Sequence, residues 1–208
     1  MGTRNLTCVQ KDNKLIVAKY CQWDGYPDGQ GRTVVDFILN KFDKVLFLKK
    51  IRNVSDMTTE ELDEKWVECG AEPDTSGVNM TVSAKFKANY PYLHRDMGGE
   101  ILEYIQNLEG ELKILFSKDF AIDSLFCEYA YVLNLDEDTL DFFTGFNTDG
   151  PQRNIFFDPE TDELERKKHR ETIYYPVKKM ETFTFDEIRK QGAENIVKKM
   201  QKCENRGE

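Results

Sequence analysis

The chain has 208 residues, of which 39% are hydrophobic, 12% aromatic and 32% charged. This apolar content is enough for a hydrophobic core, which argues against a disordered chain, and the length permits folding without disulfides or a structural metal. The formal net charge of −9 is opposite in sign to the basic surface of general nucleic-acid-binding proteins, so we expect no generic DNA binding.

The N-terminal segment predicts an antiparallel β-hairpin. Residues 5–10 and 15–22 are short runs rich in β-branched and apolar residues, as is typical of strands. They are joined by four residues that include Asp12 and Asn13, which tolerate the left-handed backbone of a tight turn. We expect the two strands to be adjacent in a sheet.

The next segment, residues 22–31, contains three glycines, a proline and two aromatic residues, a composition that excludes a regular element. Beyond it, Thr33 and Asp36 approximate a capping box, and apolar residues follow at helical spacing as far as Leu46. We predict one helix over 33–49, with one face packed on the N-terminal hairpin. That face comprises Val35, Ile38, Leu39 and Phe42.

In the middle of the chain we predict two helices, separated by a loop and by a break at Tyr90 and Pro91. A capping box of Thr58 and Glu61 marks the start of a second helix. A loop rich in Pro, Asp, Ser and Gly follows at 70–77, and a further helix is expected over 97–108. Two glycines in the first turn of that helix weaken it, each by ~1 kcal/mol relative to alanine.

From residue 111 the pattern changes to strands, and Thr184 with Glu187 then begins a last amphipathic helix, which ends in a charged tail from about residue 200. The candidate strands are 112–116, 126–135, 139–146, 154–157 and 172–177. This order of elements predicts antiparallel hairpins with packed helices, which is an α+β fold. No linker or repeat divides the chain, so we expect a single compact domain over 1–208.

Cysteine usage predicts a reduced protein. The five cysteines are widely spaced, and no pair has the C-x-x-C spacing of a zinc or redox site. The sequence has neither a membrane-spanning apolar run nor a basic and apolar leader. We therefore expect a cytoplasmic protein with reduced thiols, no metal, no cofactor and no membrane association. The cysteines are Cys8, Cys21, Cys69, Cys127 and Cys203.

No established catalytic or cofactor motif occurs in the sequence: G-x-S-x-G, H-E-x-x-H and G-x-x-x-x-G-K-[ST] are all missing. The acidic run from Asp158 resembles the start of a calcium loop, but Glu163 replaces its glycine and His169 its final carboxylate. The other histidine, His94, is more typical of a capping or surface residue than of a catalytic base. We assign no catalytic and no metal-binding residue.

The Gln22–Gly31 loop is the strongest candidate for a binding site. Its glycines permit close backbone approach, its two aromatic residues offer flat apolar faces, and it carries a carboxylate. Such a set suits a base, a sugar or a peptide edge, but the aromatic residues would equally suit a turn that fills the core between sheet and helix. The candidate binding residues are Gln22, Trp23, Asp24, Tyr26 and Gln30.

Two motifs resemble a recurring family of uncharacterised proteins of phages, prophages and bacteria. They are M-G-T-R-N-L-T at residues 1–7 and Y-C-Q-W-D-G-Y-P-D-G-Q-G at residues 20–31. Residues 92–96 and 128–132 are similar to later segments of that family, and Cys21 replaces a glycine. The resemblance implies an accessory protein of a mobile element, and small acidic proteins of that kind often inhibit a host enzyme or a defence system.

We therefore expect a non-catalytic counter-defence inhibitor in the host cytoplasm, which binds a host protein through an acidic surface and the Gln22–Gly31 loop. The partner would be a nucleic-acid enzyme or a defence effector with a basic surface. One alternative is an N-terminal-nucleophile hydrolase, which requires processing before Thr3 or Cys8 because Gly2 carries no nucleophile. The other is a sponge that captures a small nucleotide in the aromatic and glycine-rich loop.

Overall fold

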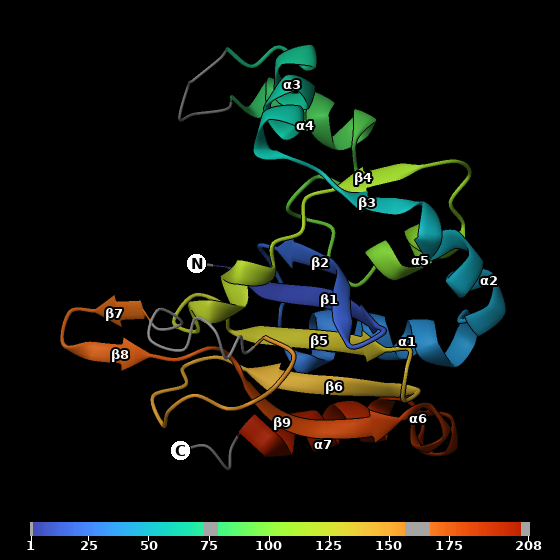
Figure 1. Cartoon of the computed structure of the whole chain (residues 1–208), viewed down its shortest axis with the longest axis vertical. Coiled ribbons are helices and arrows are strands. Elements are labelled where there is room, and N and C mark those ends of the chain that lie inside the picture. Colours follow the sequence, from blue (N-terminus) through green and yellow to red (C-terminus); the bar gives the residue numbers. More distant parts are fainter. Residues whose placement is uncertain (1, 73–78, 157–166, 205–208) are drawn as a thin grey trace.

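The centre of the molecule is a five-stranded mixed sheet with the strand order β2-β1-β5-β6-β9 (Figure 1). This computed structural model describes residues 2–72, 79–156 and 167–204. The strands of the sheet are β1 (Asn5–Lys11), β2 (Lys14–Cys21), β5 (Tyr129–Asn134), β6 (Thr139–Thr144) and β9 (Lys178–Thr184). The fold is α+β, as predicted.

The predicted N-terminal hairpin is confirmed. β1 and β2 are antiparallel, and Asp12 and Asn13 in the turn have φ angles of 53° and 57°. On its other side β1 pairs with β5 in parallel orientation, a long-range pairing that the sequence did not predict. β5 and β6 form a second antiparallel hairpin, and β9 adds to β6 antiparallel.

Each face of the sheet has its own core. The period-two alternation of β1 places Val9 in the core shared with the helices and places Leu6 and Cys8 in a second core on the opposite face. The helical core contains residues of α1 (Arg32–Asn40), α6 (Phe185–Gln191) and α7 (Ala193–Glu204). The second core is closed by residues 118–122 and 154–156.

The prediction of one helix over 33–49 is wrong. Its start is not capped by Thr33, because α1 begins at Arg32 and the Thr33 hydroxyl donates to the carbonyl of Gly29 at 3.3 Å. α1 ends at Asn40, and α2 (Lys44–Lys50) begins after Asp43, whose carboxylate accepts the amide hydrogen of Leu46 at 3.0 Å. This N-cap starts a new helix. Val45, which extended the apolar spacing in the sequence, is 82% exposed. Val35 and Ile38 are buried in the same core as Val9 and Val17 of the hairpin, and Leu39 and Phe42 pack against that core. The main neighbours of α1 are other helices, among them α6 and α7, so direct packing of this face on the hairpin stays a prediction.

A pair of helices, α3 (Thr59–Glu68) and α4 (Met80–Asn89), stands at the top of Figure 1, apart from the main sheet. The capping box of Thr58 and Glu61 is confirmed, whereas α4 was not predicted. The two helices share a small core in which the rings of Trp66 and Phe86 stack with centroids 3.6 Å apart. Beside them, β3 (Val54–Asp56) pairs in parallel with β4 (Leu112–Ile114).

The remaining predicted elements are shortened or shifted. The helix expected over 97–108 is α5 (Ile101–Gln106), which begins only after the two glycines. No strand is present over 154–156, and residue 157 lies outside the described residues. β7 (Lys167–His169) and β8 (Thr172–Tyr174) form a small hairpin that projects from the molecule (Figure 1).

The C-terminal helix begins with the predicted capping box of Thr184 and Glu187. It breaks at Gly192, whose φ angle is 76°, into α6 and α7. The charged tail is helical as far as Glu204, and the rest of it lies outside the described residues. No helix in the described part of the chain is long and apolar enough to cross a membrane.

Candidate functional site

The Gln22–Gly31 loop connects β2 to α1. The prediction that it contains no regular element is wrong, because Pro27–Gly31 form a π-helical turn. Hydrogen bonds to its main chain tie the loop to other parts of the chain. The amide of Gly25 donates to the carbonyl of Thr3 at 2.9 Å, and the hydroxyl of the buried Tyr131 donates to the carbonyl of Gly25 at 2.8 Å. These bonds fix the loop to the N-terminus and to β5. The backbone of the loop is therefore held in a defined conformation.

The glycine amides of the loop are used inside the protein. Besides Gly25, the amides of Gly29 and Gly31 donate to the carbonyl of Tyr26 at 3.0 Å and 3.2 Å. A glycine-rich loop that cradles phosphate needs free amide hydrogens that point at the ligand. These three amides are therefore not free to bind a phosphate group, and the alternative of a nucleotide captured by the loop stays a prediction that rests on its aromatic residues.

Three of the five predicted binding residues are exposed on this loop. Trp23 is 45% exposed and Tyr26 is 50% exposed, and Asp24 between them is exposed in the left-handed region with a φ angle of 58°. The Trp23 ring covers Gly2, where an added Cβ would come within 2.2 Å of the ring, and its Nε1–H donates to Asp96 at 3.0 Å. Trp23 is thus held in place while half of it faces solvent.

The two glutamines support the loop instead. Gln30 is buried, and its Oε1 accepts the amide hydrogen of Gly99 at 2.6 Å. Gln22 is partly buried, and its Oε1 accepts the hydroxyl hydrogen of Tyr20 at 2.5 Å. Gln30 therefore fills the interior, whereas the two aromatic residues, which the alternative placed in the core, are about half-exposed. The binding role of the loop stays a prediction.

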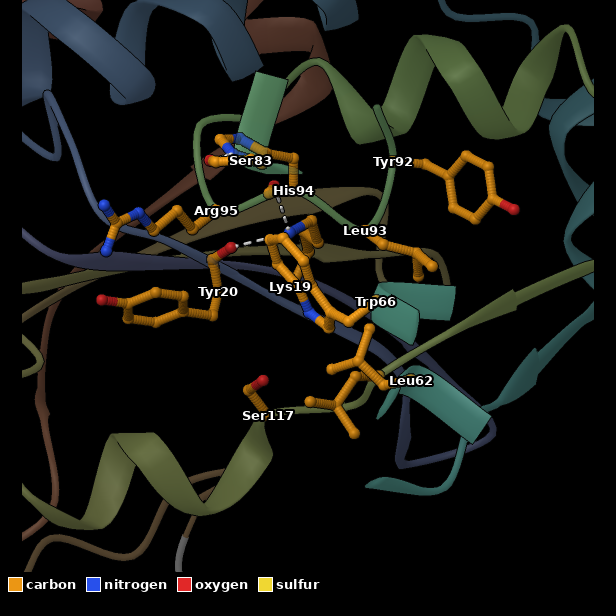
Figure 2. Close-up of a pocket in the computed structure, with 11 residues that line it drawn as sticks. Lys19, Tyr20, Leu62, Trp66, Ser83, Tyr92, Leu93, His94, Arg95 and Ser117 are labelled. Atoms are coloured by element: carbon orange, nitrogen blue, oxygen red, sulfur yellow. Dashed lines mark hydrogen bonds between the residues drawn. The ribbon is translucent and has the colours of Figure 1, made fainter. Parts of the chain in front are cut away.

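A cavity of about 420 Å³ adjoins the loop, between β2, the α3–α4 pair and residues 92–95. We call it the Lys19 pocket (Figure 2). The loop and the pocket are connected, since the amide of Gln22 donates to the carbonyl of Arg95 at 2.8 Å, and Arg95 lines the pocket. The apolar part of its wall consists of Leu62, Trp66, Leu93 and Leu115.

The pocket is built around a buried lysine. Lys19 is only 5% exposed, and its Nζ donates to the carbonyls of Tyr20 at 2.9 Å and His94 at 3.0 Å, as the dashed lines in Figure 2 show. In the described part of the chain no carboxylate lies within ion-pair distance of this ammonium group. Burial lowers the pKa of Lys19 to about 8, an effect partly offset by nearby acidic groups.

Ser83, His94 and Asp96 approximate the order of a nucleophilic triad. His94 Nε2 lies 3.4 Å from Ser83 Oγ, and His94 Nδ1 lies 3.4 Å from an Asp96 carboxylate oxygen. In a working triad Nδ1–H donates to the carboxylate, which leaves Nε2 free to accept the proton of the serine. Here Nδ1 accepts the Asp96 amide hydrogen at 3.3 Å.

With the Asp96 amide hydrogen on Nδ1, the proton of the neutral imidazole is on Nε2, which then faces Ser83 as a donor. Burial lowers the pKa of His94 and keeps the ring neutral at pH 7. A ring in this state holds Ser83 as an acceptor and does not remove its proton. This arrangement provides no activated nucleophile.

The nucleophiles considered for the hydrolase alternative are also inaccessible. Cys8 lies in the middle of β1 with 0% exposure, and burial raises the pKa of its thiol. Thr3 is buried as well. A protonated, buried thiol is not reactive.

Metal ligands do not gather in the described residues, where no group of three or more His, Cys, Asp and Glu side chains could hold an ion. The acidic run of residues 158–163 lies outside the described residues. His169 instead lies 3.0 Å from a carboxylate oxygen of Asp123.

No family model matches the chain, and no curated protein and no solved structure is significantly similar to it.

Proposed function

We propose that this protein acts by binding a protein partner, and that the Gln22–Gly31 loop is the centre of its contact surface. The observation that carries this proposal is the pair of half-exposed aromatic residues, Trp23 and Tyr26, on a loop whose backbone is fixed by hydrogen bonds. Aromatic side chains dominate the binding energy of many interfaces. A fixed loop loses little conformational entropy on binding, which favours affinity.

The charge around these aromatic residues defines the partner. Asp24 and Asp28 are exposed on the same loop, and the chain as a whole carries a net charge of −9. An acidic surface of this kind associates fastest with a basic surface, because complementary fields steer the encounter. The partner we propose is therefore a basic protein surface, such as the groove of an enzyme that acts on nucleic acid.

The resemblance to phage and prophage proteins supports a more specific role. A mobile-element protein that binds a basic host enzyme would act as an inhibitor, so we propose a counter-defence role in the host cytoplasm. The inaccessible Cys8 and the unactivated Ser83 favour such a binding role over a hydrolase. The occupied glycine amides argue against a nucleotide sponge built on the loop.

The test is capture of a partner from host cells, followed by measurement of its affinity for loop variants. Truncation of a true hot-spot residue costs about 2 kcal/mol or more, which is about a 30-fold increase in Kd. We expect this loss for Trp23→Ala and Tyr26→Ala. Met80→Ala is the matched control, because Met80 is a large apolar residue that is 90% exposed on α4.

Far-ultraviolet circular dichroism and thermal melting must show that the loop variants are folded. Trp23→Phe keeps an aromatic ring at this position, but it loses the bond to Asp96 and the part of the indole that lies over Gly2. If both alanine variants fold and bind the partner as tightly as the wild type, the contact surface lies elsewhere. Turnover of an amide or phosphodiester by the purified protein would refute the binding role.

A further inference from the structure

We propose that the Lys19 pocket binds a small aromatic anion, a flat ring system that carries a phosphate or carboxylate group, such as a nucleoside monophosphate. This inference is independent of the protein-binding role of the loop. It rests on the charge of the pocket, on its aromatic wall and on its volume.

The pocket contains a buried positive charge that has no carboxylate partner among the described residues. Lys19 Nζ carries three hydrogens, of which two are donated to backbone carbonyls. The nearest acidic groups are already engaged, since Asp96 pairs with Lys87 at 2.7 Å and Glu100 accepts the amide of Gly98 at 3.0 Å. A buried ammonium group with only carbonyl neighbours is costly, and an anion that enters the pocket would compensate its charge.

The lining of the pocket contrasts with the rest of this acidic protein. None of the described residues that line it is acidic. Arg95 also lines it, but its exposed guanidinium extends away from Lys19 (Figure 2), so Lys19 supplies the positive charge inside the pocket. Two other surface pockets are each lined by three carboxylates. One contains Glu100, Glu103 and Glu109, and the other contains Glu128, Asp149 and Glu204. An anion is therefore expected to select the Lys19 pocket over these.

The aromatic wall is the second argument. Trp66 lines the pocket, and one face of its indole is covered by Phe86, with ring centroids 3.6 Å apart and planes within 7°. This stacking holds the indole rigidly, while another part of it borders the cavity beside Leu62 (Figure 2). A flat ring placed there gains stacking and apolar contact, while its acidic group approaches Lys19. The volume of about 420 Å³ is typical of sites for ligands of this size.

The test uses the intrinsic fluorescence of Trp66. The chain has two tryptophans, so Trp23→Phe leaves Trp66 as the single emitter at the pocket. Nucleoside monophosphates, the corresponding nucleosides, indole-3-acetate and inorganic phosphate are titrated into this variant. We expect saturable quenching with a Kd below 1 mM for at least one aromatic anion, and binding at least tenfold weaker for the uncharged nucleosides and for phosphate alone.

Lys19→Met in the same background is expected to raise the Kd at least tenfold, whereas Lys49→Met, which removes an exposed lysine on α2, leaves it unchanged. If the methionine variant does not fold, two other variants replace it. Trp66→Leu, measured by calorimetry, is then the variant expected to lose binding, and Lys19→Arg is the variant that retains the charge. If only nucleoside monophosphates quench the fluorescence, the acidic group is a phosphate. If only indole-3-acetate quenches it, the acidic group is a carboxylate.

Absence of binding by every aromatic anion up to 1 mM would overturn the proposal. Equal binding of nucleosides and nucleotides, or equal binding by Lys19→Met, would overturn it as well. The loop variant Tyr26→Ala, which leaves the bond between Trp23 and Asp96 in place, should keep the pocket affinity by calorimetry. The outcome at the pocket is therefore distinguishable from failure of the proposed protein-binding role.

Discussion

Replacement of Lys19 by methionine should change how the stability of the protein depends on pH. Lys19 is 5% exposed, and burial lowers its pKa from about 10.5 to about 8. Below pH 8 the ammonium group is charged in both the folded and the unfolded state, so its full burial penalty destabilises the fold. Between pH 8 and pH 10.5 the unfolded chain binds more protons than the folded one, so this group makes stability rise with pH.

The magnitude follows from the difference in pKa. Each pKa unit corresponds to 1.36 kcal/mol, so a difference of about 2.5 units amounts to roughly 3 kcal/mol, of which roughly 2.5 kcal/mol is recovered between pH 7 and pH 10. Lys19→Met has similar length and no charge, so it removes this term. It also leaves the carbonyls of Tyr20 and His94 without their donor, at about 1 kcal/mol each. At pH 7 we therefore expect the variant to be at least as stable as the wild type.

Urea denaturation of both proteins at pH 7 and at pH 10 measures the effect. Burial raises the pKa of Tyr131 and of Cys127, so these groups lose protons in this range only in the unfolded chain. Their contribution is common to both proteins and cancels in the difference. The stability of the variant relative to the wild type should fall by about 2–3 kcal/mol from pH 7 to pH 10. Parallel pH profiles, like those expected for Lys49→Met, would show that Lys19 is solvated and that the reasoning is wrong.

Two further predictions concern the loop and the thiols. Gly29→Ala should destabilise the protein by about 1–3 kcal/mol, because an added Cβ would lie 2.3 Å from the carbonyl oxygen of Asp24; a melting temperature equal to that of the wild type would contradict this tight packing. All five cysteines are buried, so a thiol reagent should label none of them rapidly in the native protein and all five after denaturation, and fast labelling of Cys8 in the native state would contradict the burial of β1.

Local patterns predicted the fold class, the N-terminal hairpin and the capping boxes at Thr58 and Thr184, since each depends on residues close together in the sequence. Local patterns did not predict elements whose pairing depends on residues far apart in the sequence. The parallel pairing of β1 with β5 joins residues more than a hundred positions apart, which no local pattern encodes. β9 was missed because its residues are mostly charged or polar and only partly buried.

The break between α1 and α2 was predictable in principle, because Asp43 is a good N-cap. The helical spacing of apolar residues continued across it through Val45, and that spacing was misleading because Val45 is exposed. For helices, a capping residue inside an apolar pattern is therefore evidence for two elements.

The Lys19 pocket was only weakly indicated in the sequence, through the alternation of residues in β2. Lys19 follows Val17 at the strand period of two, and Val17 is fully buried, so the alternation alone places a lysine on an apolar face of β2. What the alternation does not show is the other wall, since Trp66 and Ser83 come from α3 and α4, and their position depends on how that helix pair docks. The loop was found from composition, but which of its residues face solvent depends on contacts with Gly2 and Gly99.

The loop and the pocket depend on one short segment, His94–Asp96. His94 offers its carbonyl to Lys19, Arg95 offers its carbonyl to Gln22, and Asp96 accepts the indole hydrogen of Trp23. Residues that share partners in this way do not act additively when substituted. A ligand that displaces this segment would move the support of Trp23, and affinity for a partner at the loop would then be thermodynamically linked to occupancy of the pocket, with the same coupling in both directions.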